Sequence, residues 1–362
     1  MYPIAKRRGD LDFAKGCLIF LVIWGHICPN SSGADYANTW CALARINSLF
    51  LMSLFFMISG YVIKPCCTSS QLAQRLKKTF FRLVVPLFSW GVLFFLITSF
   101  TRLVKMWDHI SSIFDYPIIN YLFYFRKIAL TVNLYWFISC LIICICLSSL
   151  LYYIKERIPG FIGRILIYVS IILIPFLPIH HFHFTFFWPF YIIGSLIKND
   201  ESISSLSKRI IEMPAACLIL LTLLCTYMGY SHKPIDSFYY PNNHPLWWLL
   251  LRYLVYLISS VCAFILFRKA YYSLRYNSVV LFIEKAGRET LFLYLSHMII
   301  LNQIYNPIVM NMTNSAGILP NYPIIRFYVY STIFAIILFK ALYYLTYIIK
   351  KNTVLKSVLL GK

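Results

Sequence analysis

Two ionisable side chains, Lys15 and His26, flank the apolar run GCLIFLVIWG near the start of this 362-residue chain. At about 100° per residue they share one face of a helix, about 16 Å apart along its axis, and Asp12 lies on nearly the same face. Ionisable groups inside a membrane span are costly, which makes them functional candidates. A neutral imidazole can also take a proton from a hydroxyl group. We therefore predict that His26 and Lys15 are catalytic and that Asp12 supports them.

A structural interpretation of the same residues stays open. Lys15 could extend its ammonium group to the membrane surface, and His26 could hydrogen-bond a neighbouring helix. Each residue alone favours that interpretation, whereas their common face favours function.

A second histidine, His297, lies inside a later apolar segment, directly after Ser296. Adjacent residues of a helix point about 100° apart, so the pair cannot readily hydrogen-bond and a serine nucleophile is not expected. We predict that His297 lines the same cavity as His26, with an interhelical hydrogen bond as the alternative. Glu289, near the start of that segment, could orient a base, although acidic residues are favoured at helix N-termini in any case.

The composition indicates which elements hold these residues. Apolar residues make up 60% of the chain and charged residues 12%, against about 45–50% and about 25% in soluble domains. One water-soluble core cannot hide that much apolar surface, so we expect an all-α integral membrane protein in contact with the lipid bilayer. The net charge of +21 would suggest nucleic-acid binding in a soluble protein. In a membrane protein it is first a topology signal, and no nucleic-acid partner is expected.

About ten membrane-spanning helices are predicted, because each needs about 20 apolar residues. The fifth and sixth are short and contain prolines, so a hydrophobic hairpin is the alternative there, and segment 103–131 is expected to be interfacial or re-entrant. The expected spans are 12–29, 46–63, 83–101, 132–154, 162–179, 182–198, 211–230, 246–267, 288–306 and 323–349.

The distribution of lysine and arginine predicts the orientation of these spans. Most of these bases fall in the gaps that share a side with the N-terminus, which by the positive-inside rule places both termini in the cytoplasm. No repeat and no linker to a soluble domain is visible, so residues 1–362 are treated as one membrane domain.

Cysteine and histidine usage gives weak signals. Cys28 and Cys41 flank the first expected outer loop and could form a disulfide in an oxidising compartment. His180, His181 and His183 are close enough in sequence to bind a metal, but interfacial polar residues beside aromatic rings have the same composition. No metal site is therefore assigned.

The first segment, DLDFAKGCLIFLVIWGH, resembles the opening signature of the family 3 membrane acyltransferases, in which a basic residue and a histidine are separated by ten residues. Other blocks resemble that family in the same order along the chain. They are SLFLMSLFFMISGYVIK (residues 48–64), RLVVP (82–86), the Tyr135-Trp136-Phe137 triplet and GRETLFLYLSH (287–297). Lysine at position 15 makes the chain most similar to the branch of fucose 4-O-acetylase-like and enterobacterial common antigen acetyltransferases. From this resemblance we predict that Trp136, within that triplet, is a supporting residue of the site.

The resemblance implies a multi-pass enzyme of the bacterial cytoplasmic membrane. It would transfer an acetyl group from acetyl-CoA to a sugar hydroxyl of a cell-envelope glycan or lipid-linked sugar, with no permanently bound cofactor. The phosphates of acetyl-CoA need cations on the cytoplasmic side. We predict that Lys15, Arg75, Lys78 and Arg82 supply them, although the positive-inside rule alone also explains the last three.

A different class of function stays open. A transporter or flippase of a lipid-linked glycan could line its path with Lys15, Arg252, Arg326 and His297. Binding of coenzyme A would separate the two, because a flippase has no use for an acyl donor.

Overall fold

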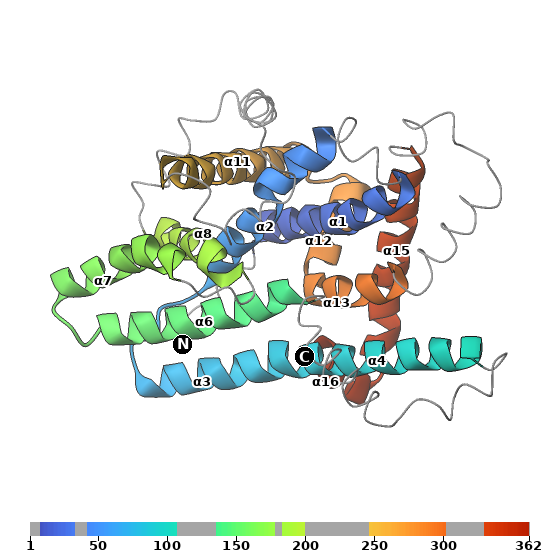
Figure 1. The fold of residues 1–362 in the computed structure, drawn as a ribbon, viewed down its shortest axis with the longest axis horizontal. Helices are drawn as coiled ribbons and strands as arrows, with labels where there is room; N and C mark the ends of the chain where they lie inside the picture. Colours follow the sequence, from blue (N-terminus) through green and yellow to red (C-terminus); the bar gives the residue numbers. More distant parts are fainter. Residues whose placement is uncertain are drawn as a thin grey trace.

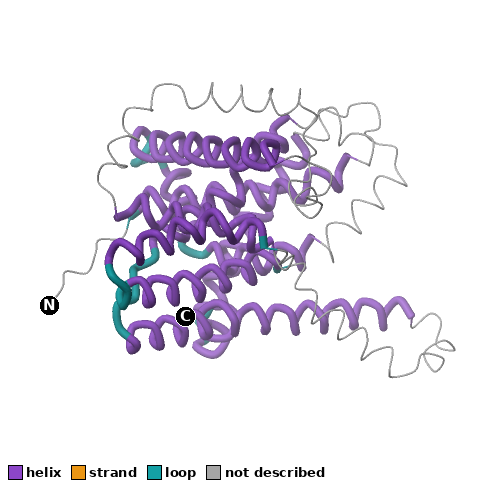
Figure 2. The backbone as a smooth tube through the Cα atoms, turned by 60° about the vertical axis from the view of Figure 1, so that its left-hand side comes forward, coloured by secondary structure: helices purple, strands orange, loops and turns teal. Residues whose placement is uncertain are grey.

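The computed structural model describes residues 8–32, 42–106, 135–177, 183–199, 246–301 and 329–361, and all regular elements in these ranges are helical (Figure 1). Many of the helices run alongside one another in stacked rows (Figure 2). In chain order they are α1 (Gly9–Ser32), α2 (Ala42–Val62), α3 (Ser69–Thr79), a π-helical turn (Phe80–Val84), α4 (Val85–Met106), α6 (Trp136–Lys155), α7 (Gly160–Leu173), a 3₁₀ turn (Ile174–Phe176), α8 (Phe184–Asn199), α11 (Leu246–Ser273), α12 (Ser278–Gly287), α13 (Thr290–Ile300), α15 (Ser331–Lys350) and α16 (Thr353–Leu360).

Each expected span except 211–230 overlaps a described helix, and 211–230 lies outside the described residues. Three described helices are long and apolar enough to cross a membrane, namely Trp136–Lys155, Leu250–Ser273 and Ser331–Lys350. Helix α7 is shorter but turns Phe161, Ile172 and other large apolar side chains outward, as expected of a lipid-facing surface. The all-α membrane character is confirmed, whereas ten spans and cytoplasmic termini stay predictions.

Most of segment 103–131 lies outside the described residues, and so do Cys41 and the side chain of Cys28. The expected interfacial segment and the possible disulfide therefore stay predictions. The seven cysteines whose side chains are described are free thiols.

Helix α1 occupies the centre of the described bundle, where it contacts α2, α11, α12, α13 and α15. Its apolar side chains recur at the three- and four-residue spacing of a helix stripe, and Ala14, Leu18, Ile19 and Ile23 are completely buried. The helix that carries Lys15 and His26 is thus enclosed by other helices along much of its length.

Glycines allow α1 and α12 to pack backbone against backbone. A methyl group added to Gly16 would overlap the carbonyl oxygen of Ile283, and one added to Gly287 would overlap the carbonyl oxygen of Asp12. Small residues permit this kind of close helix crossing inside membranes. The crossing fixes the N-terminal end of α1, where Lys15 and Asp12 lie.

Helices α2 and α8 meet in the same way. A methyl group on Gly60 would overlap the carbonyl oxygen of Tyr191, and one on Gly194 would overlap that of Met57. Because neither helix backbone can yield without breaking its own hydrogen bonds, this contact tolerates only glycine at both positions.

Replacing Gly60 by alanine is expected to destabilise the protein by about 1–3 kcal/mol, the usual cost of overpacking a close contact. The unfolding temperature of the detergent-solubilised protein measures this loss. Gly91 is the matched control, because it also lies within a helix but has no other atoms near a Cβ added to it, so Gly91→Ala should leave the unfolding temperature unchanged or raise it. Equal effects of the two substitutions would show that the α2–α8 contact is not close.

Helices α3 and α4 run almost end to end along one edge of the molecule (Figure 1), joined by the π-helical turn. Pro86 explains the turn, since proline lacks an amide hydrogen and its ring clashes with the carbonyl four residues earlier in a regular helix. The amide of Val85 instead donates to the carbonyl of Phe80, five residues back. Such widened turns are frequent at functional sites, and this one contains Arg82.

The C-terminal helix α16 supports this turn from outside. The indole Nε1 of Trp90 donates a 3.1 Å hydrogen bond to the carbonyl of Leu359. Gly361, with a left-handed φ of 63°, packs directly on the backbone of Arg82, where a Cβ would clash. A residue 279 positions away along the 362-residue chain thus holds Arg82 in place.

Candidate active site

Four basic side chains from two separate parts of the sequence line one cavity of about 290 Å³. Lys15 comes from α1, Arg75 and Lys78 come from α3, and Arg82 comes from the π-helical turn. The spacing of three and four residues places the last three on one face of a continuous helical stretch. Lys77 lies off that face and is exposed.

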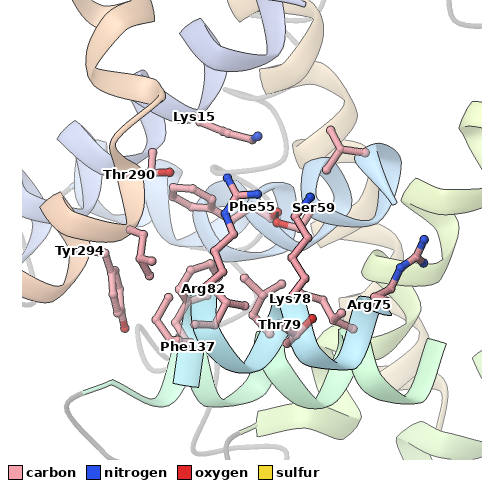
Figure 3. Close-up of a pocket in the computed structure, with 16 residues that line it drawn as sticks. Lys15, Phe55, Ser59, Arg75, Lys78, Thr79, Arg82, Phe137, Thr290 and Tyr294 are labelled. Carbon is pink, nitrogen blue, oxygen red and sulfur yellow. Dashed lines mark hydrogen bonds between the residues drawn. The ribbon is translucent and has the colours of Figure 1, made fainter. Parts of the chain in front are cut away.

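The four bases differ in how they face the cavity. Lys78 and Arg82 extend toward Lys15, whereas the guanidinium of Arg75 points away from the other three (Figure 3). Lys78 and Arg82 are exposed and Lys15 is half-buried. Nη1 of Arg75 is buried and has no hydrogen-bond partner among the described residues. The positive charge is therefore concentrated where Lys15, Lys78 and Arg82 converge.

The remaining wall of the cavity is mostly apolar. Phe55 and Val62 come from α2, Phe137 and Leu141 from α6, and Leu291 from α13. Few polar groups interrupt it, among them the hydroxyls of Ser59, Thr79 and Thr290. A cluster of cations beside an apolar wall suits a ligand with an anionic part and a long, weakly polar part.

His26 and His297 lie side by side, with ring centroids 5.4 Å apart. His26 has exposed surface, whereas His297 has none. The sequence could place each histidine in an apolar segment but not show that α1 and α13 bring the two rings together. Neither residue lines the basic cavity itself.

Tyr294 connects the basic cavity to the histidine pair. This buried residue lines the cavity, and its ring centroid is 5.6 Å from that of His297. On the other side its ring contacts Phe137, at 5.1 Å between centroids. Sequence reasoning missed Tyr294, although its position three residues before His297 puts both on one face of α13.

A network of ion pairs fixes the N-terminal end of α1. The carboxylate of Asp12 is buried and lies 3.6 Å from Nε of Arg288, which also pairs with Glu284. Asp10 pairs with Arg8 at 2.6 Å and with Arg268 at 3.1 Å. Asp12 thus joins α1 to the C-terminal end of α12, and its supporting role stays a prediction.

The pKa of Asp10 reflects this network. Burial alone would raise it, but the hydrogen bond from Arg8, with the positive charges of Arg8 and Arg268, holds the pKa below its ordinary value. Asp10 therefore stays ionised near neutral pH and keeps both arginines in place.

Two predicted supporting residues lie away from the histidine pair. The carboxylate of Glu289 accepts a 2.7 Å hydrogen bond from Lys350, and eight residues of α13, about 12 Å, separate it from His297. Trp136 stacks on Phe187 at 5.6 Å and meets the edge of His183. Its neighbour Phe137, not Trp136, lines the basic cavity.

The other polar residues singled out in the sequence do not reach this cavity or cannot be placed. Arg252 is buried in α11, with its guanidinium 5.9 Å from the ring centroid of Tyr256. Arg326, His180 and His181 lie outside the described residues. No group of three or more potential metal ligands occurs within the described parts of the chain.

Comparison with known proteins identifies the family of the chain. The family model described as an acyltransferase domain, of the family 3 acyltransferases, matches residues 8–344, which is nearly the whole chain. Comparisons with curated proteins and with solved structures find no significant match. Because the match covers nearly the whole chain, the chain belongs to the family 3 acyltransferases.

Proposed function

We propose that this membrane acyltransferase moves an acetyl group from acetyl-CoA to a sugar hydroxyl of a cell-envelope polysaccharide or lipid-linked sugar. The observation that carries the proposal is the convergence of Lys15, Lys78 and Arg82 on a cavity whose wall, at Tyr294, touches the histidine pair. A phosphate-bearing acyl donor and a base for the acceptor hydroxyl would then meet at Tyr294. The chain would work in the bacterial cytoplasmic membrane as one domain, with both termini in the cytoplasm.

The cavity can be matched to parts of the donor. Its apolar wall suits the pantetheine arm, and its volume of about 290 Å³ is too small for the whole coenzyme. The diphosphate and nucleotide would therefore lie at the mouth, where Lys78 and Arg82 are exposed. Lysine and arginine both bind phosphate strongly through charge-assisted hydrogen bonds. Lys15, which is half-buried, is placed to contact a more deeply held phosphate or the thioester carbonyl.

In the proposed reaction His26 acts as the general base. It takes the proton of the sugar hydroxyl while that oxygen attacks the thioester carbonyl carbon, and the carbon–sulfur bond then breaks. The proton passes from His26 to the departing thiolate, which yields free coenzyme A and the sugar ester. A positioned base of this kind typically contributes about 10²–10⁴-fold to the rate.

The resemblance of the first segment to the fucose 4-O-acetylase-like and enterobacterial common antigen branch supports a sugar as the acceptor. Mass spectrometry of the envelope glycans of the host, with and without the gene, is expected to show the loss of an acetyl group from one sugar. Unchanged glycans would remove the support for a sugar acceptor.

The donor can be tested directly on the purified full-length protein. We expect it to bind coenzyme A and to consume acetyl-CoA in the presence of an acceptor extract. A transporter of lipid-linked glycan would do neither. Absence of both binding and consumption at saturating acetyl-CoA would contradict the proposed donor.

A further inference from the structure

His297 is held in one orientation and one protonation form by its own helix. Its Nδ1 lies 3.1 Å from the carbonyl oxygen of Leu293. A carbonyl oxygen can only accept a hydrogen bond, so Nδ1 must carry the hydrogen and donate it. In the neutral ring Nε2 is then left with a lone pair and no hydrogen.

This lone pair accepts no hydrogen bond from the residues that the structure describes. Nε2 of His297 is buried and has no hydrogen-bond partner among the described residues, although buried polar atoms are nearly always paired. The His26 ring lies against it, at 5.4 Å between centroids and with the ring planes inclined by 41°. Catalytic hydrogen bonds are often long in structures without substrate and shorten when it binds.

Among the described residues, two polar side chains from this part of the bundle already donate hydrogen bonds elsewhere. The hydroxyl of Tyr135 donates to the carbonyl of Leu295 at 3.3 Å, and Trp24 donates to Thr332 at 3.0 Å. The nearest carboxylates along α1 and α13, Asp12 and Glu289, are bound to Arg288 and Lys350. His297 therefore stands where a carboxylate would orient the histidine of a Ser-His-Asp triad.

We propose that His297 is a positioning residue for His26, accepting a hydrogen bond from the second ring nitrogen of His26 while the first removes the proton of the acceptor hydroxyl. This inference rests on the proposed function. The hydrogen bond selects the tautomer of His26 whose free nitrogen faces the acceptor, and it stabilises the imidazolium formed during transfer. His297 itself neither gains nor loses a proton.

Three substitutions separate this role from simple packing. His297→Gln keeps an acceptor oxygen near the place of Nε2, whereas His297→Asn keeps only the polar atoms near Nδ1 and His297→Leu keeps neither. Losing a hydrogen bond to a charged group should lower kcat about 10- to 100-fold in the Asn and Leu variants. The Gln variant should retain clearly more activity, and the KM for acetyl-CoA should not change in any of them.

A double substitution gives the sharper readout. If His297 acts through His26, the double variant His26→Ala/His297→Leu should be no slower than His26→Ala alone. The inference would be overturned if the losses of activity of the two single variants multiplied in the double variant, or if the Gln and Leu variants were equally active. It would also be overturned if the loss of activity followed the loss in unfolding temperature. Failure of the wild-type protein to consume acetyl-CoA would instead overturn the proposed function, and the inference with it.

Discussion

Replacing His26 by alanine should lower the rate of acyl transfer about 10²- to 10⁴-fold, the range that a general base contributes. Binding of coenzyme A should be retained, because His26 does not line the basic cavity and is proposed to handle the proton of the acceptor. Single-turnover transfer measures the first quantity, and calorimetric titration with coenzyme A measures the second. The wild-type rate should also fall at acid pH, because a protonated imidazole cannot accept the proton.

Ser296→Ala is the matched control for this variant. Ser296 is buried beside His297, and its hydroxyl donates to the carbonyl of Phe292 at 2.7 Å, so it is not free to act as a nucleophile. Its loss should leave turnover nearly unchanged. If His26→Ala transfers acyl groups at a near-normal rate while folded, His26 is structural and His297 becomes the leading candidate for the base.

Neutralising the basic cavity should weaken donor binding with little effect on turnover. Each charge-assisted hydrogen bond contributes about 1.5–3 kcal/mol, so the triple variant of Arg75, Lys78 and Arg82 to Gln should raise the KM for acetyl-CoA at least about 100-fold. Most of that effect should come from Lys78 and Arg82, which extend toward Lys15, and less from Arg75 (Figure 3). A change in KM at nearly constant kcat marks the loss of ground-state binding.

The control for this variant removes three other bases from the same expected side of the membrane. Lys64, Lys77 and Lys285 are exposed and do not line the cavity. Their replacement by Gln removes the same amount of positive charge but should leave the KM for acetyl-CoA unchanged. Equal increases in the KM for acetyl-CoA in both triple variants would show that Arg75, Lys78 and Arg82 act only as topology signals.

Substitutions of Lys15 test the deeper part of the same cavity. Lys15→Ala should weaken the binding of acetyl-CoA, and Lys15→Arg should keep part of it, because arginine retains the positive charge at this position. Full activity is not expected, since the two side chains differ in shape and in hydrogen-bond geometry at a tight site.

Much of the helical framework could be predicted from hydropathy, because long apolar segments such as those of α6 and α15 admit few other structures. Hydropathy could not find α3, α12 or α16, whose sequences are short or rich in polar residues. Their helical form depends on caps such as Thr68, Asn277 and Asn352 and on packing against other helices. These are the elements that hold Lys78, Glu284 and the backbone of Arg82.

The sequence predicts individual residues of the candidate site but not the contacts between helices that bring them together. Spacing placed Lys15 with His26 on α1, and Lys78 with Arg82 on one helical face, because both relations lie within a single helix. The contact of His297 with His26 depends on how α13 packs on α1, which no spacing within either segment encodes. The same holds for Tyr294, whose importance lies in linking two groups from distant parts of the chain.

In the proposed reaction the acyl donor enters the basic cavity with its thioester toward Tyr294 and the histidine pair. The most direct test is a cryo-electron microscopy structure of the purified full-length protein with coenzyme A bound. We expect the diphosphate within hydrogen-bond distance of Lys78 and Arg82, and the thiol end of the pantetheine arm against Tyr294. Coenzyme A bound on another surface, or with its thiol directed away from Tyr294, would contradict this mode of donor binding.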